Sequence, residues 1–163
     1  MDACATKPWY KNTVFVLLGD HGVNLPSEID VPLSYNHIPF IIHAPGLYPK
    51  GQVRDQLANQ TDVYPTIMGM LGRDYVQNSM GYDLFREKRP FAFFSQDHKL
   101  GVINEEFLYV ARKSGRESIY QYRNKGKLDD LADRYPTLMD SMKNYACKHL
   151  QVSQWMIERQ LTK

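Results

Sequence analysis

The sequence predicts an α/β fold: a mixed sheet with flanking helices, then a region of antiparallel strands and a long terminal helix. Two short apolar runs, at 13–18 and 38–43, precede a helical segment and are typical of buried strands. Residues 100–123 alternate in hydrophobicity around turn residues, as antiparallel strands do. From residue 136 onward, apolar side chains recur every three or four positions. Strands interrupted by helices and followed by consecutive strands indicate this mixed class.

The first half of the chain reads as two strands joined by a loop. Residues 13–18 (TVFVLL) form a continuous apolar run, which predicts a strand covered on both faces in a parallel or mixed sheet. Residues 22–36 contain two prolines and several turn formers, so we expect a loop there. Residues 38–46 (IPFIIHAPG) repeat the pattern of a short buried strand, ended by Pro-Gly.

The second half begins with a predicted helix. In TDVYPTIMGMLG, either Thr61 or Asp62 can cap this helix, Pro65 falls in its first turn, and Gly72 is a natural stop. A strand at 91–94 follows, then two or three antiparallel strands that turn near Asn104 and at Ser114-Gly115. Pro136 opens the last helix. Its apolar stripe consists of Leu138, Met142, Tyr145, His149, Val152 and Met156.

Composition limits the classes of partner. The chain has 163 residues, of which 43% are hydrophobic and 23% charged, as in a soluble globular domain. A net charge of +2 indicates neither a nucleic-acid nor a membrane surface. We find no apolar run long enough to span a membrane and no signal-peptide core, so we expect this polypeptide to be soluble. Cys4 and Cys147 lack the close spacing of zinc or redox motifs, and whether they pair stays open.

The chemistry lies where the first strand ends, in GDHG at 19–22. Ligands of open α/β sheets collect beyond the carboxyl ends of strands. Asp20 and His21 are a carboxylate and an imidazole, and together they can bind a divalent cation. Adjacent residues on a regular strand face opposite ways, so we expect Gly19 and Gly22 to allow a tight turn that aims both side chains at one point. The alternative is a structural turn with an exposed histidine.

Other histidines and carboxylates have simpler explanations. His43 lies within an apolar run, which favours packing in the sheet. Asp97 and His98 repeat the Asp-His dipeptide without its strand and glycines, so we expect no site there. His149 lies on the apolar stripe of the last helix and is expected to be a satisfied core or boundary residue. Capping explains Thr61 and Asp62 without catalysis.

The order of these blocks resembles the sulfatase branch of the alkaline phosphatase superfamily, especially its lipoteichoic acid synthase and phosphoglycerol transferase members. The resemblance runs from WYKNTVFVLLGDHG through YNHIPFIIHAPG and DVYPTIMGMLG, then loosely into FAFFSQDHKLGVINEEFLYV. It covers most of the chain and implies an alkaline phosphatase-like fold. GDHG alone is a weak signal, whereas three blocks at these spacings are fairly specific.

The resemblance implies an enzyme that transfers or hydrolyses a sulfate or phosphate ester with a divalent metal ion. It makes Asp20 and His21 metal ligands and gives His37 a contact with substrate or metal; otherwise His37 is a loop histidine bonded to a backbone carbonyl. The family's nucleophile, a threonine or modified cysteine, lies upstream of the DHG strand, so the catalytic residues here stay unassigned. A histidine ligand favours manganese or zinc, with calcium and magnesium as alternatives.

The expected organisation is therefore the C-terminal part of a catalytic domain over 1–163, with a metal-site half at 1–90 and antiparallel strands plus the terminal helix at 91–163. Because the nucleophile and further ligands lie outside it, we expect the isolated chain to bind metal poorly and to be inactive. The expected partners are an ester substrate and the missing N-terminal part, with no nucleic acid. Membrane anchoring, at a periplasmic or extracytoplasmic face, would be a property of the longer protein. The alternative is a noncatalytic binding or scaffold domain.

Overall fold

The computed structural model describes residues 1–124 and 128–161, and the chain divides into two compact units. The N-terminal unit comprises Met1–Asp55 and the C-terminal unit comprises Gln56–Lys163. The division at 90/91 expected above separates metal-site residues from the strand region, and it stays a prediction. Each unit is described separately below.

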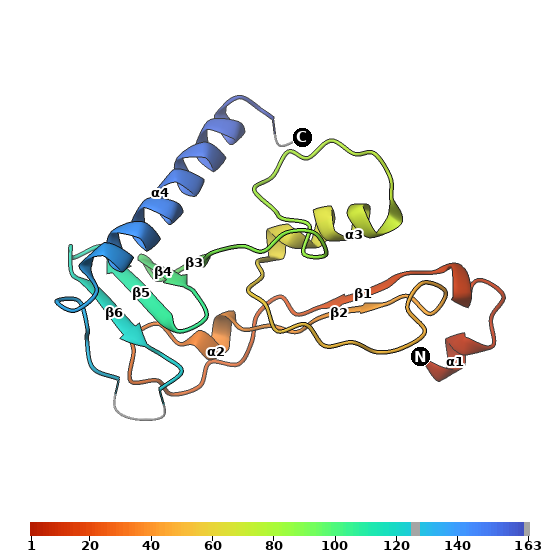
Figure 1. Ribbon diagram of the computed structural model, residues 1–163, viewed down its shortest axis with the longest axis horizontal. Helices are drawn as coiled ribbons and strands as arrows, with labels where there is room; N and C mark the ends of the chain where they lie inside the picture. The colour runs from red at the N-terminus through yellow and green to blue at the C-terminus, as the bar shows by residue number, and fades with distance from the viewer. Residues whose placement is uncertain (125–127, 162–163) are drawn as a thin grey trace. The chain divides into compact units, whose positions relative to one another are not determined.

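The N-terminal unit is built on a two-stranded antiparallel ribbon (Figure 1). Phe15 of β1 lies opposite His43 of β2, and Leu18 lies opposite Phe40. Both predicted strands are confirmed. The segment predicted as a loop ends in one short helix, α2, which its prolines and turn formers did not indicate. The elements of this unit are α1 (Asp2–Ala5), η1 (Tyr10–Asn12), β1 (Phe15–Leu18), α2 (Leu33–Asn36) and β2 (Phe40–His43).

One expectation about β1 is wrong: its faces are not covered in this chain. Val16, Leu17 and Leu18 are 40%, 45% and 42% exposed, and Ile41 on β2 is 52% exposed. A strand is covered on both faces only if further strands and layers pack around it. An apolar run indicates that a strand is suited to burial on both faces. In this chain β1 pairs only with β2 in a two-stranded sheet, so that burial is not provided.

The C-terminal unit contains a four-stranded antiparallel sheet in the order β3-β4-β5-β6. Each strand pairs with the next in sequence, which confirms the predicted meander, and a long helix follows it as expected. The elements of this unit are η2 (Gln60–Asp62), α3 (Val63–Leu71), β3 (Ala92–Gln96), β4 (Lys99–Ile103), β5 (Phe107–Arg112), β6 (Glu117–Gln121) and α4 (Pro136–Glu158). The α/β class with an antiparallel region and a long terminal helix is confirmed.

Turn chemistry explains the register of this sheet. Asp97 and His98 join β3 to β4 with φ angles of 49° and 62°, the left-handed conformation that two-residue hairpin turns require. This second Asp-His dipeptide is therefore a hairpin turn. Between β4 and β5, the Asn104 side-chain oxygen accepts the amide of Phe107 at 2.6 Å. Gly115, with φ of 86°, turns the chain before β6.

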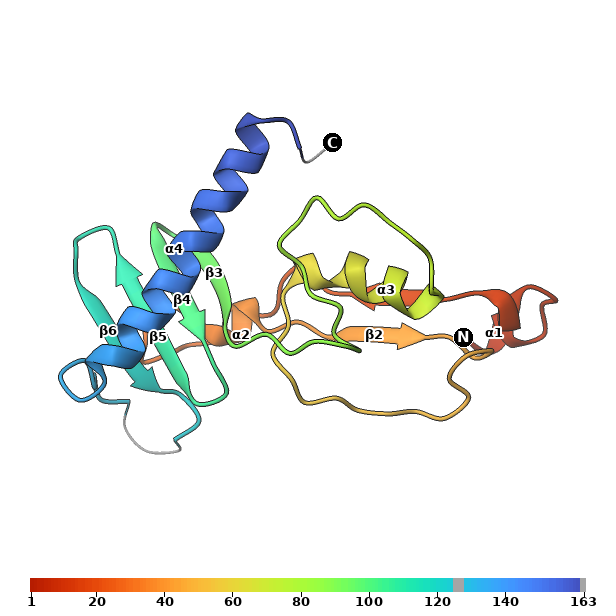
Figure 2. The ribbon, with the colours of Figure 1, turned by 45° about the horizontal axis from the view of Figure 1, so that its top comes forward.

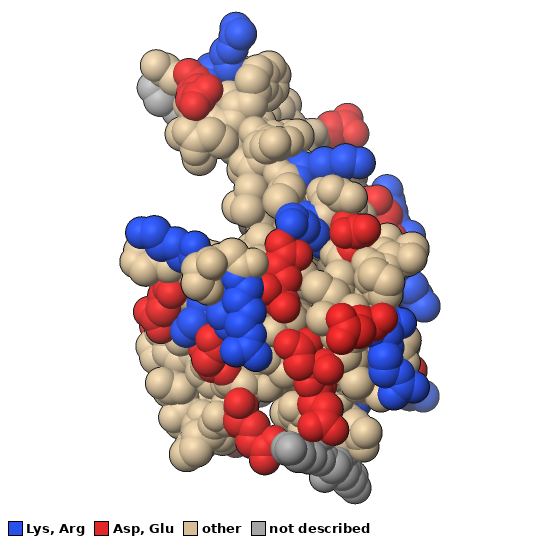
Figure 3. All heavy atoms as spheres, turned by 90° about the vertical axis from the view of Figure 1, so that its left-hand side faces the viewer, with Lys and Arg blue, Asp and Glu red and all other residues tan. Residues whose placement is uncertain are grey.

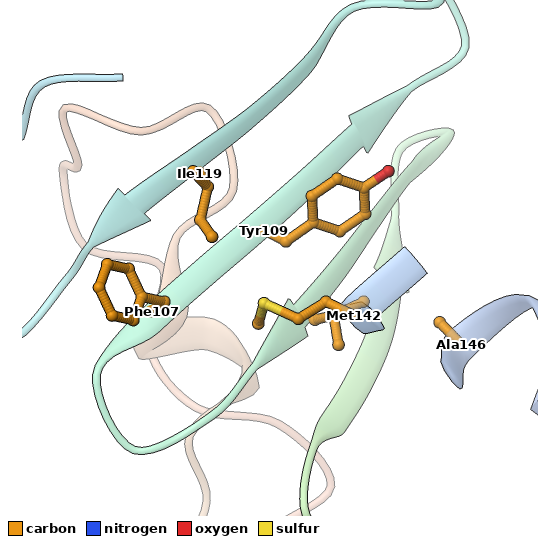
Figure 4. Close-up of a cluster of buried hydrophobic side chains, with 6 residues drawn as sticks. Phe107, Tyr109, Ile119, Met142 and Ala146 are labelled. Atoms are coloured by element: carbon orange, nitrogen blue, oxygen red, sulfur yellow. The ribbon is translucent and has the colours of Figure 1, made fainter. Parts of the chain in front are cut away.

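Helix α4 crosses one face of this sheet and extends beyond it (Figure 2). Met142 and Ala146 of α4 are fully buried against Tyr109 and Ile119 of the sheet, and they form the main core (Figure 4). Burying a side chain the size of methionine stabilises a fold by about 1.5–3 kcal/mol. His149 is also buried, and its Nδ1 lies 2.9 Å from the Tyr145 carbonyl, so the predicted satisfied core histidine is confirmed.

The start of α3 corrects the expected helix cap. Asp62 precedes α3, but its side chain does not cap that helix. Its Oδ2 accepts the Asn59 amide at 2.7 Å, as part of a capping box at the start of η2, and its Oδ1 accepts the Tyr82 amide at 2.9 Å. Arg89 donates to the same carboxylate, and both side chains are at most 1% exposed. Asp62 and Arg89 thus form a buried ion pair between residues that lie 27 positions apart in the sequence. Pro65 and Gly72 occupy their predicted places in α3.

Surface features are unexceptional over the part of the chain that the structure describes. On the face drawn in Figure 3, acidic and basic side chains are interspersed, and neither sign forms a continuous field. Within the described ranges, no helix combines the length and apolarity needed to cross a membrane.

Candidate metal centre

Asp20 and His21 lie directly after β1 and converge on one point. Asp20 Oδ2 is 3.8 Å from His21 Nε2. Both side chains face solvent, at 90% and 55% exposure respectively. The predicted convergence at the strand end is therefore present in the geometry, without burial of either group.

The tautomer of His21 is set by a backbone carbonyl. His21 Nδ1 lies 2.8 Å from the oxygen of Gly22, and a carbonyl oxygen can only accept a hydrogen bond. Nδ1 therefore carries a proton. In the neutral imidazole, the lone pair is then on Nε2, the nitrogen that faces Asp20. This arrangement is common among metal-binding histidines, whose second nitrogen donates to a carbonyl or carboxylate.

The Asp20 carboxylate is held in its ionised form. The His21 amide donates to Asp20 Oδ1 at 2.9 Å. This backbone hydrogen bond is the main cause that lowers the pKa of Asp20, and the aspartate's own amide and the imidazole add to the effect. Oδ1 is thereby occupied by a donor from the turn, while Oδ2 faces the imidazole.

Gly22 attaches this turn to α2. Its amide donates to the Tyr35 carbonyl at 2.7 Å. A Cβ atom at this position would lie 2.1 Å from the Ser34 carbonyl oxygen and 2.9 Å from that of His37. The glycine is therefore required by the close approach of two backbone segments. Gly19 has ordinary space around it, so the expectation that both glycines serve the turn conformation needs this correction.

Two further contacts join the turn to α2. The imidazole of His21 stacks on the ring of Tyr35, with centroids 4.9 Å apart and planes inclined by 12°. The Leu25 amide donates to Ser34 Oγ at 3.2 Å. The Asp-His turn is consequently held by a backbone hydrogen bond, a ring stack and a side-chain hydrogen bond.

A divalent metal ion fits the two facing atoms. Zinc binds imidazole nitrogen and carboxylate oxygen at about 2.0–2.2 Å, which places two tetrahedral ligand atoms about 3.4 Å apart. The observed 3.8 Å is a few tenths of an ångström wider, and the exposed Asp20 side chain can close that difference by a small rotation. Within residues 1–124 and 128–161, no cluster of three or more metal-binding side chains exists, so the fit extends to two ligands.

His37 lies beside this turn through its backbone. Its amide closes α2 by donating to the Leu33 carbonyl at 2.9 Å, and its own carbonyl lies against Gly22. The side chain is exposed. Asp20, His21 and His37, which the sequence proposed as site residues, therefore belong to one structural neighbourhood of the N-terminal unit.

The remaining candidates have structural roles or lie elsewhere. His43 is on β2, and its Nε2 lies 2.7 Å from the Tyr10 hydroxyl, which agrees with a packed strand histidine. Cys4 of the N-terminal unit and Cys147 of the C-terminal unit are free thiols.

Sequence reasoning missed Tyr35. It lies in the segment expected to be a loop, and its only signal was its position two residues before His37. Tyr35 and His21 are separated by thirteen residues, so no local sequence periodicity indicates that their rings stack. The Asp62–Arg89 pair was missed for the same reason, because its partners are far apart in sequence.

Comparisons with known proteins bear on the family and the fold of this chain. A family model described as Sulfatase matches residues 5–73, which include Asp20, His21 and His37. An alkaline phosphatase superfamily protein from Vibrio parahaemolyticus has a TM-score of 0.74 at 22% identity, over 94% of this chain and 38% of that one. A protein from Bacteroides thetaiotaomicron, provisionally identified as a sulfatase, has a TM-score of 0.71 at 18% identity, over 94% of this chain and 39% of that one.

These matches first define the class, an alkaline phosphatase-like fold. Within that class, residues 5–73 match the Sulfatase family model, which agrees with the resemblance noted in the sequence. It spans less than two fifths of the length of the two structures described above.

Proposed function

We propose that this chain is the C-terminal part of a metal-dependent enzyme that hydrolyses or transfers sulfate or phosphate esters. The observation that supports this proposal is the approach of Asp20 Oδ2 to His21 Nε2 at 3.8 Å, with the imidazole proton placed on the other nitrogen. A carboxylate oxygen and an imidazole nitrogen that face each other in this way can both be ligands of one cation placed between them.

The residues of this chain would contribute ligands and their orientation. A divalent cation bound there would supply Lewis acidity, lowering the pKa of a nucleophile and neutralising charge on the transferring oxygens. Asp20 would provide a carboxylate that stays ionised because the His21 amide holds it. His21 would provide Nε2, because its Nδ1 is engaged by the Gly22 carbonyl. The nucleophile would come from chain outside this sequence.

The proposal of a partial domain rests on two observations. The chain covers 38% and 39% of the two alkaline phosphatase-like structures compared above. The ribbon of β1 and β2 exposes leucine, valine and isoleucine side chains of the kind that central strands bury. We propose that the missing N-terminal part of the same domain covers these strands and brings the remaining ligands to Asp20.

His37 is proposed to contact the substrate. Its exposed imidazole follows α2, whose end lies against Gly22, so its backbone is anchored to the metal-binding turn. A neutral or charged imidazole can donate a hydrogen bond to an ester oxygen. Among metals we favour manganese or zinc, because both accept an imidazole ligand more readily than calcium does.

Transfer of phosphoglycerol, as in lipoteichoic acid synthase-like enzymes, is the finer form of this proposal, and sulfate ester hydrolysis is its alternative. The longer protein would act at the periplasmic or extracytoplasmic face of the membrane, with or without an anchor. An assay of the full-length protein with a nitrophenyl sulfate and a nitrophenyl phosphate diester distinguishes these reactions. We expect metal-dependent turnover of one ester, lost in Asp20→Asn; turnover of both esters unaffected by chelator would contradict the proposal.

A noncatalytic scaffold is the second candidate. It is favoured by the lack of a third metal-binding side chain near the turn in the ranges that the structure describes. A full-length protein without a threonine or cysteine at the start of an upstream helix would support this candidate over the enzyme.

A further inference from the structure

We propose that Tyr35 is the positioning residue of His21: it fixes the imidazole so that Nε2 is presented beside Asp20 Oδ2. The positioning itself is a property of this chain. Its consequence for metal binding rests on the function proposed above.

The ring contact has the geometry of a positioning interaction. The His21 and Tyr35 rings are nearly parallel, at 12°, with centroids 4.9 Å apart. Offset-stacked aromatic pairs are stabilised beyond the area that they bury. The imidazole is otherwise 55% exposed, so the tyrosine ring is the flat surface against which its plane is set. Without that surface, rotation about the side-chain torsions of His21 would sweep Nε2 away from Asp20.

The backbone of the same tyrosine restrains the other end of the histidine. The Tyr35 carbonyl accepts the Gly22 amide at 2.7 Å, and the Gly22 carbonyl accepts the proton of His21 Nδ1 at 2.8 Å. Tyr35 therefore contacts the imidazole in two ways, directly through its ring and indirectly through the two hydrogen bonds of Gly22. The ring stack fixes the plane of the imidazole, and the hydrogen bond to the Gly22 carbonyl places a proton on Nδ1.

Helix α2 is suited to hold Tyr35 in place. Pro32 precedes the helix with its restricted φ of −70°, and its carbonyl accepts the Tyr35 amide at 3.2 Å. The Ser34 hydroxyl adds a bond from the Leu25 amide. Tyr35 is therefore anchored before it meets His21, which is what an orienting residue requires.

The chain contains a matched control within the same unit. Tyr10 and His43 form a second tyrosine-histidine pair, in which the hydroxyl contacts Nε2 at 2.7 Å and the rings are tilted by 46°. In that pair, contact is made by the hydroxyl. In the Tyr35 pair, contact is made by the ring face, so loss of a hydroxyl should affect only the first.

The test is NMR spectroscopy of the metal-free chain, reading the ring protons and imidazole nitrogens of His21 and His43. Wild type should show the Nδ1-protonated tautomer of His21, ring-current shifts, and nuclear Overhauser effects between the His21 and Tyr35 rings. Tyr35→Leu should remove the shifts and mix the tautomers, whereas Tyr35→Phe should retain both. Tyr10→Phe should alter His43 and leave His21 unchanged.

Two results would overturn the proposal. One is a wild-type His21 without the tautomer preference or ring contacts, a result that stands even if Tyr35→Leu fails to fold. The other is Tyr35→Leu with folded amide spectra and unchanged His21 signals. A parallel titration with Mn²⁺ alone separates the metal role: we expect Tyr35→Leu to weaken binding about tenfold, the lower end for residues that orient metal ligands. If Mn²⁺ does not broaden wild-type His21, the metal assignment fails, while the metal-free spectra still decide the role of Tyr35.

Discussion

The two units of this chain place similar apolar strands in opposite surroundings. Leu17 on β1 is 45% exposed, whereas Leu108 on β5 is fully buried. The unit with the exposed strands carries the metal-competent turn, and the unit with the buried strands carries the helix-covered core. Candidate chemistry and packing are thus separated along the sequence. The comparison teaches that an apolar strand sequence indicates suitability for burial. The chain itself buries such strands in the C-terminal unit but not in the N-terminal unit.

The largest expected effect tests the packing of the C-terminal unit. Arg89→Met would leave the Asp62 carboxylate buried without its partner, and breaking such a pair costs about 3–5 kcal/mol. Denaturant unfolding followed by a probe in this unit measures the loss. The control is Arg116→Ala, which removes a solvent-exposed pair with Asp130 and should cost less than about 1 kcal/mol. Equal losses for both variants would contradict the account.

The second prediction compares the two leucines directly. Leu108→Ala creates a cavity at a fully buried site and should cost about 2–5 kcal/mol. Leu17→Ala removes a side chain that is nearly half in water, so we expect a loss below about 1 kcal/mol. Amide hydrogen exchange within each unit reports the two values separately. A larger loss at Leu17 would show that β1 is packed in solution.

The third prediction concerns the attachment of the turn to α2. In Gly22→Ala, the new methyl group would collide with the Ser34 carbonyl, and the backbones must separate at a cost of about 1–3 kcal/mol. Amide chemical shifts should change around residues 19–25 and 33–37 and stay constant in the C-terminal unit. Gly51→Ala is the control, because its Cβ would meet nothing within 4 Å.

The smallest effect is a pH dependence in the C-terminal unit. The bond from Lys143 of α4 is the main cause that lowers the pKa of Glu117 on β6. Because the folded-state pKa is lowered, this contribution is present above the carboxyl's ordinary value and is lost as the pH falls through the lowered one. Both side chains are partly exposed, so solvent screens the pair and the contribution is small. Glu117→Gln should abolish this part of the pH profile; an unchanged profile would exclude the pair as its cause.

The sequence predicted most elements because their signals are local. The meander followed from alternation and from turns at Asn104 and Gly115, and α4 followed from its periodic apolar stripe and Pro136. The family resemblance followed from ordered blocks, which the Sulfatase match and the alkaline phosphatase-like structures confirm.

What the sequence did not reveal depends on contacts between distant residues. The prolines of the 22–36 segment favoured a loop, so α2 was not predicted, nor was the stack of Tyr35 on His21. Asp62 takes part in a capping box at the start of η2, but the ion pair of its carboxylate with Arg89 could not be foreseen from the local sequence. The exposure of Leu17 depends on how many further strands and helices pack around β1, and the sequence of β1 alone does not contain that information.

The most direct test of the metal site is a Mn²⁺ titration of the chain, followed by selective broadening of its NMR signals, in wild type and Asp20→Asn. We predict weak binding that broadens signals of residues 19–22 first and disappears in Asp20→Asn, because two facing ligands bind a cation together and one does not. Broadening that is absent from this turn, or that is equal in the two proteins, would contradict the assignment of Asp20 and His21 as a shared metal site.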